Sequence, residues 1–221
     1  MPRSEFIHLH LHTQYSLLDG ACRIPEILNL ANQYKMDSLA ITDHGNMFGA
    51  IDFYLEAQKA GIKPIIGCEA YVAPASRLDK NSGGIEEAAY HLILLARDET
   101  GYQNLMKLVS IGYLEGFYYR PRVDKEILAL YSKGLIALTA CLKGEIPGLL
   151  QQRRFNDALK AADTYFNIFG KDNFYLELQG NSIPEQKIVN AGLIKISKEL
   201  NIPLVATNDV HYLTKDRSKA H

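Results

Sequence analysis

The sequence predicts a single α/β domain in which strands and helices alternate around a closed or nearly closed barrel. Short apolar runs recur along the chain, helical patterns fill most of the spaces between them, and histidines and carboxylates gather where the runs end. Strands that alternate with helices indicate βαβ units and a mostly parallel sheet. Seven such runs in 221 residues favour a barrel over the alternative, an open doubly wound sheet.

The predicted strands are runs of four or five residues, the length of buried strands. They cover residues 6–9, 38–42, 64–68, 91–95, 135–139, 174–178 and 203–207. Helices are predicted at residues 24–34, 48–60, 100–111, 155–169 and 183–200. Pro25 and Pro184 lie near helix starts, where proline is tolerated, and Gly61 and Gly170 suit helix ends. Residues 75–87 and 113–124 are predicted as the two long loops.

The composition is ordinary for a globular protein, with 47% apolar and 22% charged residues. A net charge of −1 gives no overall attraction to nucleic acid, which would need a local basic patch or bound metals. Three scattered cysteines indicate no disulfide framework and favour a reducing, cytoplasmic setting. No run approaches the roughly 20 apolar residues that span a bilayer, so no membrane partner is expected.

Two pairs of polar residues, one near each end of the chain, carry the most information. His10 and His12 follow the first predicted strand, and Asp209 and His211 follow the last. Residues i and i+2 of a strand point to the same side, so each pair projects two potential ligands together. Because α/β proteins build their sites at strand ends, the two pairs predict one metal centre assembled from the whole chain.

Single candidates lie beside other predicted strands. They are His44, Glu69, His91 and Cys141, and Asp19 is a further candidate seven residues after His12. Each alone would more often be a structural residue, and a lone cysteine is usually a small buried hydrophobe. Together, so many ligand-type residues at strand boundaries are improbable as coincidence. His91 precedes its apolar run, so either the strand begins earlier or the residue reaches in from a loop.

The segment Phe6–Gly20, which contains His8-Leu9-His10-Leu11-His12, closely resembles the opening of the PHP (polymerase and histidinol phosphatase) domain. More narrowly, it is similar to that domain at the N-terminus of the DNA polymerase III alpha-subunit family of bacterial replicative polymerases. The match continues through residues 41–45, 67–69, 100–105, 119–122 and 206–212 and covers essentially the whole chain. The run at 100–105 is typical of the polymerase branch rather than of the free-standing phosphatases.

The resemblance implies a distorted seven-stranded, TIM-like (β/α) barrel with three divalent metal ions at the C-terminal mouth of the strands. Nine residues become ligands and thereby carry the catalysis. The sets are His10, His12, Glu69 and Asp209; Glu69 as a bridge with His91 and Cys141; and Asp19, His44 and His211. Asp19 and Cys141 stand where free-standing phosphatases typically have histidines. The mixture of ligands suits Zn²⁺ or Mn²⁺, with iron or Mg²⁺ as alternatives.

The activity that the resemblance implies is metal-dependent phosphoester hydrolysis, as a 3′–5′ exonuclease that proofreads DNA. Residues 1–221 are expected to be a single PHP domain and a fragment of a longer DNA-directed DNA polymerase, without polymerase activity of its own. The expected partners are a single-stranded or mismatched DNA 3′ end, the rest of the polymerase chain and a proofreading subunit. The alternatives are hydrolysis of pyrophosphate or a small phosphomonoester, and a metal-stabilised structural module.

Two arginines in the second predicted loop, Arg120 and Arg122, are candidates for bidentate binding of a substrate phosphate. Their alternative role is in a solvated loop or an interface with the rest of the polymerase. Tyr118 and Tyr119 are candidates to stack on a terminal base, although packing is the more common role for such residues. Lys143 is ambiguous in the same way.

Overall fold

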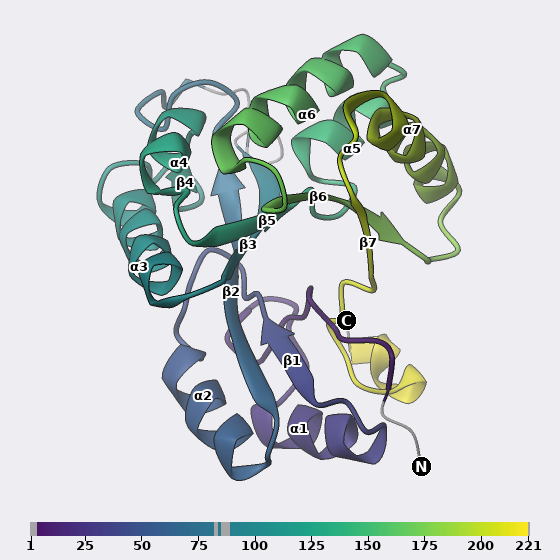
Figure 1. Cartoon of the computed structure of the whole chain (residues 1–221). Helices are drawn as coiled ribbons and strands as arrows, with labels where there is room; N and C mark the ends of the chain where they lie inside the picture. Colours follow the sequence, from purple (N-terminus) through teal and green to yellow (C-terminus); the bar gives the residue numbers. More distant parts are fainter. Residues whose placement is uncertain (1–3, 82–83, 85–88, 221) are drawn as a thin grey trace.

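The computed structural model describes residues 4–81, 84 and 89–220, and a curled sheet with helices on its outer side forms the centre of the molecule (Figure 1). The strands are hydrogen-bonded in the order β1-β2-β3-β5-β6-β7, and β4 pairs with β2. Their bounds are β1 Ser38–Ile41, β2 Lys63–Val72, β3 Tyr90–Ala96, β4 Arg122–Val123, β5 Leu135–Leu138, β6 Phe174–Gln179 and β7 Leu204–Thr207. The predicted seven-stranded α/β architecture is confirmed.

The helices pack on the outside of this sheet. They are α1 Ile24–Gln33, α2 Ala50–Lys59, α3 Glu99–Leu114, α4 Lys125–Tyr131, α5 Glu145–Gln151, α6 Phe155–Phe169, α7 Pro184–Leu200 and the 3₁₀ helix η1 Lys215–Ala220. Asp98 and Asp124 cap α3 and α4 by accepting hydrogen bonds from the backbone N–H groups of Gly101 and Ile127. All five predicted helices are present, whereas the seven-residue helices α4 and α5 were not predicted.

Strand β3 runs against its neighbours. It pairs antiparallel with β2 and with β5, while the other pairs in the sheet are parallel. An antiparallel pair needs no crossover helix, and no helix was predicted between β2 and β3. The direction of β3 places its first residues, including His91, at the same end of the barrel as the carboxyl ends of the parallel strands. The position of His91 before its apolar run is thereby explained.

The prediction of a strand at residues 6–9 is wrong. Residues 8–13 instead lie between β1 and the segment that follows β7: Ala40 N–H donates to the His8 carbonyl, and His12 N–H donates to the Val210 carbonyl. These bonds alternate between two neighbours, so no regular ladder forms. The seventh strand is β4, which lies within the predicted loop at 113–124. In the other predicted loop, residues 75–81 and 84 have no regular structure, and residues 82–83 and 85–87 lie outside the described residues.

Residues on the inner face of the sheet form two layers. At one end the layer is apolar and contains Ile93, Leu95 and Leu138, with Ile65 and Val205 packed against them. Further along the same strands the period-2 pattern places Glu69 of β2, His91 of β3 and Glu177 of β6 on the inner face. The interior therefore changes from apolar to polar along the barrel axis, and the polar end carries the site.

The main core lies between the sheet and helices α3 to α7. Phe174 of β6 is fully buried there, with ring centroids 5.8 Å from Tyr165 and 6.4 Å from Phe169. A second core includes Ile27 and Leu28 of α1 and Phe53 of α2. Among the helices of the described residues, none combines the length and the apolar character that a membrane crossing requires.

Candidate metal centre

Histidines and carboxylates from distant parts of the chain meet at the polar end of the barrel. Three overlapping groups each have potential ligand atoms within 4.8 Å of one another. The groups are His10, His12, Glu69 and Asp209; His44, Glu69 and His91; and His12, His44 and His211. Asp19 and Cys141 lie beside these groups. All nine residues singled out in the sequence are thus brought to one site, which we call the ligand cluster.

One part of the ligand cluster, the inner group, consists of His10, His12, Glu69 and Asp209, and the first three of these are buried. His10 Nε2 lies 2.7 Å from Glu69 Oε2 and 3.0 Å from Asp209 Oδ1. His12 Nε2 lies 3.4 Å and 3.3 Å from the same two oxygens. Asp209 has φ +49, in the left-handed region that aspartate tolerates better than most residues. Four donor atoms therefore surround one small volume.

The remaining residues are all half-buried and form the rim group: Asp19, His44, His91, Cys141 and His211. His44 lies with Nε2 3.3 Å from Asp19 Oδ2, and His211 Nε2 lies 3.8 Å from the same oxygen. Cys141 Sγ lies 3.7 Å from His91 Nδ1. Burial raises the pKa of the Cys141 thiol, so a cation is needed to favour its thiolate form.

Glu69 joins the inner and rim groups. Its Oε2 faces His10 and His12, whereas its Oε1 lies 3.0 Å from His44 Nδ1 and also contacts His91 Nδ1. The side chain is buried, so the cluster itself supplies the partners of this carboxylate. A carboxylate with one oxygen on each of two donor sets has the geometry of a bridging ligand.

Two buried partners set the protonation of the inner histidines. His10 Nδ1 lies 2.7 Å from Glu177 Oε1, and an ionised carboxylate can only accept, so Nδ1 carries the proton. His12 Nδ1 lies 3.0 Å from Ser16 Oγ, whose own proton goes to Asp43 Oδ1 at 2.7 Å. Ser16 therefore accepts from His12. When neutral, both imidazoles therefore point an Nε2 lone pair into the volume that they share with the Glu69 and Asp209 oxygens. This is the orientation that binding of a metal ion in that volume requires.

The electrostatics of the inner group favour a cation. Burial would lower the pKa of His12, but the Asp209 and Glu69 carboxylates outweigh it and raise this pKa to about 9. The pKa of His10 is also raised, because Asp209 and Glu177 overcome the effect of burial. Burial would raise the pKa of Asp209, but His10 and His12 lower it. The carboxylates that hold protons on these imidazoles would equally stabilise a metal ion in their place.

Unsatisfied atoms test whether the residues fit divalent metals. Among the described residues, His44 Nδ1, Glu69 Oε1 and Asp209 Oδ1 are buried and make no hydrogen bond of acceptable geometry. Buried polar atoms are normally hydrogen-bonded, so such atoms within one cluster call for a different partner. Imidazole nitrogens, carboxylate oxygens and one thiol are together the donors that zinc, manganese and iron accept. The site therefore suits divalent metal ions.

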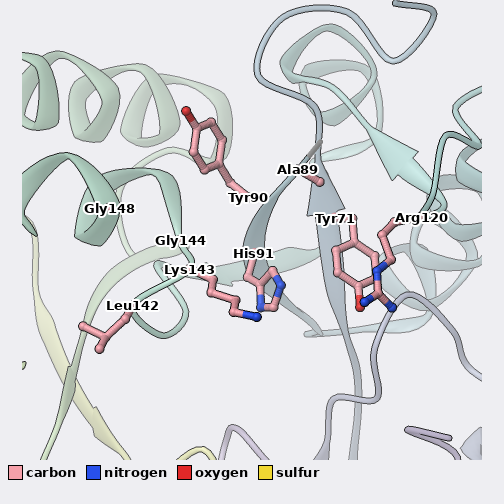
Figure 2. A pocket seen from close by; sticks show the side chains of 9 residues that line it. All are labelled: Tyr71, Ala89, Tyr90, His91, Arg120, Leu142, Lys143, Gly144 and Gly148. Atoms are coloured by element: carbon pink, nitrogen blue, oxygen red, sulfur yellow. The ribbon is translucent and has the colours of Figure 1, made fainter. Parts of the chain in front are cut away.

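The two predicted phosphate-binding arginines differ in position. Arg122 is 1% exposed, and its guanidinium donates to the carbonyl oxygens of Gly116, Arg77 and Asp79 at 3.1, 3.0 and 2.7 Å. The Arg122 guanidinium therefore stabilises the loops that carry these carbonyl groups. Arg120 lies over the Tyr71 ring at 5.3 Å, at the edge of the ligand cluster. Figure 2 shows Arg120 and Lys143 on opposite sides of His91 in a pocket of about 170 Å³.

Sequence reasoning missed the outer partners Glu177, Ser16, Asp43 and Thr207. Glu177 had a visible signal, a carboxylate within an apolar strand run, and it also accepts hydrogen bonds from Thr207 Oγ1 and from Gln179. Asp43 precedes His44 within the matching segment 41–45, but only the fold reveals that it accepts hydrogen bonds from both Thr13 and Ser16. Ser16 carries no signal that distinguishes it from a surface serine.

The curled sheet and the ligand cluster together define a class of protein. The model of the family described as PHP domain matches residues 8–181, and the chain belongs to that family. Solved structures agree on the fold. A candidate metal-dependent phosphoesterase from Bifidobacterium adolescentis has a TM-score of 0.59 at 13% identity, covering 96% of this chain and 89% of that one. An amidohydrolase from Chromobacterium violaceum has a TM-score of 0.56 at 14% identity, covering 95% and 89%.

Within the family, the chain is similar to one end of a much larger protein. DNA polymerase III subunit alpha of Borreliella burgdorferi is 55% identical over 218 residues, which are 99% of this chain and 19% of that protein. The same subunit of Thermus aquaticus is 48% identical over 220 residues, covering 98% of this chain and 18% of that protein. The chain thus spans about a fifth of the length of these relatives, and the resemblance found in the sequence is confirmed.

Proposed function

We propose that this chain is the metal-dependent phosphoesterase domain of a replicative DNA polymerase and that it removes nucleotides from DNA 3′ ends. The observation that carries the proposal is the placement of Glu69 between two donor sets, because paired divalent ions are the usual device for cleaving phosphodiesters. The similarity to DNA polymerase III alpha subunits supports DNA as the substrate. The remainder of the polymerase chain and a proofreading subunit are the proposed protein partners.

The proposed ligands follow the sets expected from the resemblance, with three ions of Zn²⁺ or Mn²⁺. The His10, His12, Glu69 and Asp209 set coincides with one observed group of donor atoms. The other two sets need Asp19 and Cys141 to join histidines that already lie close to them. When bound, such ions activate water and neutralise charge on the phosphate oxygens.

The chain's own residues orient the reaction. In the proposed hydrolysis the water oxygen joins phosphorus, the bond from phosphorus to O3′ breaks, and one proton of the water passes to O3′. The products are a shortened strand with a 3′-hydroxyl and a nucleoside 5′-monophosphate. Arg120 and Lys143, on either side of His91, are positioned to hold phosphate oxygens of the strand during this exchange.

The proposal is tested with 5′-labelled single-stranded DNA, with and without added Zn²⁺ or Mn²⁺. The chain is compared with His44→Ala, and Glu145→Gln serves as the control because its side chain binds Lys125 and Tyr165, neither of which is a candidate ligand. We expect metal-dependent shortening that His44→Ala loses, by more than about 100-fold, and Glu145→Gln keeps. Circular dichroism and metal content are measured on the same samples.

Two outcomes would favour the alternatives. Release of phosphate from pyrophosphate or a small monoester, without DNA shortening, would make the chain a small-phosphate hydrolase. Bound metal that raises the melting temperature, without hydrolysis of any of these compounds, would make it a structural module.

A further inference from the structure

A second pocket, of about 320 Å³, opens beside the ligand cluster and has an unusual wall. Six of the large apolar or aromatic side chains that line it are exposed, and we call these six the apolar wall. They are Leu17, Leu18, Phe48, Tyr113, Phe117 and Tyr119. Folding leaves this surface exposed: Leu18 is 84% exposed, Phe48 60% and Phe117 50%. Exposed apolar surface gathered beside a polar site typically marks a place where something binds.

The apolar wall is held in place by the structure behind it. Tyr15 packs against Gly49, where a Cβ atom would lie 2.7 Å from its ring, and its hydroxyl donates to Asp52 at 2.6 Å. The Tyr113 and Phe117 rings stack with centroids 6.3 Å apart. Arg122 fixes the backbone next to Phe117 through its hydrogen bond to Gly116. These contacts position the rings before any ligand arrives.

The other end of this pocket has the opposite chemistry. Asp19, His44 and His91 of the ligand cluster line it, together with Arg120 and Lys143. An apolar, aromatic surface thus adjoins a cationic and metal-ligating one. A nucleotide has the same division, because its base stacks on aromatic rings and its phosphate pairs with cations.

We infer that the apolar wall binds the unpaired 3′-terminal nucleobase of single-stranded DNA while the adjoining phosphodiester lies over the ligand cluster. This inference rests on the proposed function and names the form of DNA that the site accepts. A base can enter such a pocket only after it leaves its partner, and this costs least for a mismatched or single-stranded end. Stacking depends little on base identity, so the wall would accept any of the four bases.

The absence of tryptophan from the sequence gives a direct test. Phe117→Trp creates a single tryptophan on the apolar wall, and a base stacked on it quenches its fluorescence. The probe is an oligothymidylate, compared with the same strand ending in an abasic 3′ residue and with a blunt duplex. We expect quenching by the single strand alone. In the second arm, Phe117→Ala and Phe48→Ala should weaken binding by about 10- to 100-fold. Tyr34→Ala, at an exposed tyrosine on the C-terminal side of α1, is the matched control.

Hydrolysis separates this inference from the proposed function. We expect Phe117→Ala to slow cleavage of the normal 3′ end and to leave cleavage of the abasic end unchanged. If the unmodified chain cleaves both ends equally and the introduced tryptophan is not quenched, the base site is overturned while the nuclease stands. If the introduced tryptophan is quenched but no end is cleaved, the base site stands and the nuclease fails. Equal quenching by the duplex would also overturn the selection of unpaired ends.

Discussion

The inner and rim groups of the ligand cluster both consist mainly of histidines and carboxylates, but their histidines are held in different ways. His10 and His12 are completely buried, and each has a second nitrogen fixed by a buried partner, Glu177 or Ser16. The His44 side chain is 18% exposed and directs both ring nitrogens into the cluster, toward Asp19 and Glu69. Outer partners fix the tautomer and orientation of a metal-binding histidine. His10 and His12 are therefore oriented in advance, and His211 Nδ1 likewise pairs with the Asp209 carbonyl at 3.1 Å, whereas His44 would take its final orientation from a bound ion.

The comparison predicts that ions in the inner group exchange slowly and that those in the rim group exchange readily. Tight inner binding would hold the barrel closed, because the inner ligands join the N-terminal segment, β2 and the segment after β7. A more labile rim would adapt to substrate phosphate. Three substitutions test this division, and their expected effects differ in size.

Glu69→Gln should remove the difference in metal binding between the inner and rim groups. Glutamine keeps the size of the side chain but loses the charge that both groups share, so both should lose their ions. We expect metal-dependent hydrolysis to fall by more than about 100-fold, beyond the range of outer partners. Metal content by mass spectrometry is the measurement, with Glu145→Gln as the control. Retention of the full metal content would show that Glu69 does not bridge the two groups.

Glu177→Gln should weaken the inner group alone. The neutral amide no longer fixes the Nδ1 proton of His10 with a charge-assisted hydrogen bond, and loss of such a partner typically costs about 10- to 100-fold in metal affinity. Equilibrium dialysis against a competing chelator should show one weakened class of ion and one unchanged class. An equal loss of affinity for the ions of both groups would contradict the division into inner and rim groups. Ser16→Ala provides an independent check, because it removes the outer partner of His12.

Arg122→Lys should have the smallest effect and should leave the inner group untouched. Lysine keeps the charge but cannot reach three carbonyl oxygens with a planar fork. We expect a loss of about 1 kcal/mol in the free energy of unfolding, measured by urea denaturation. Arg154→Lys, at an exposed arginine paired with Asp157, should change nothing. If Arg122→Lys instead abolished DNA cleavage without loss of stability, the result would support the prediction that Arg122 binds a substrate phosphate.

Several elements could be predicted from the sequence because their signals are local. Apolar runs of strand length located β1, β2, β3, β5, β6 and β7, and long periodic segments located α6 and α7. The seven-residue helices α4 and α5 span only about two turns, too few for a periodic pattern. Strand β4 has two residues and exists only through its pairing with Tyr71 and Val72 of β2. The antiparallel direction of β3 could have been predicted, because no crossover helix was predicted between β2 and β3.

The candidate ligands could be predicted because histidines and carboxylates beside strand boundaries are rare and visible. Their outer partners could not, because a serine or threonine gains its role only from a neighbour distant in sequence. Ser16 acts through Asp43, 27 residues away, and Glu177 acts through His10, 167 residues away. The prediction of a strand at residues 6–9 was wrong for the same reason. The apolar run is present, but the segments on both sides of it form only isolated hydrogen bonds with it.

The contact between His10 and Asp209 has a consequence for protein synthesis. The two side chains lie 3.0 Å apart, yet most of residues 1–221 lie between them in the sequence. While residues 209–211 are still inside the ribosome, the nascent domain lacks two of its nine candidate ligands, and the segment at 8–13 lacks its hydrogen bonds to Val210. The cellular metal supply therefore meets a complete site only after translation has passed this point, and interrupted chains would be left without one.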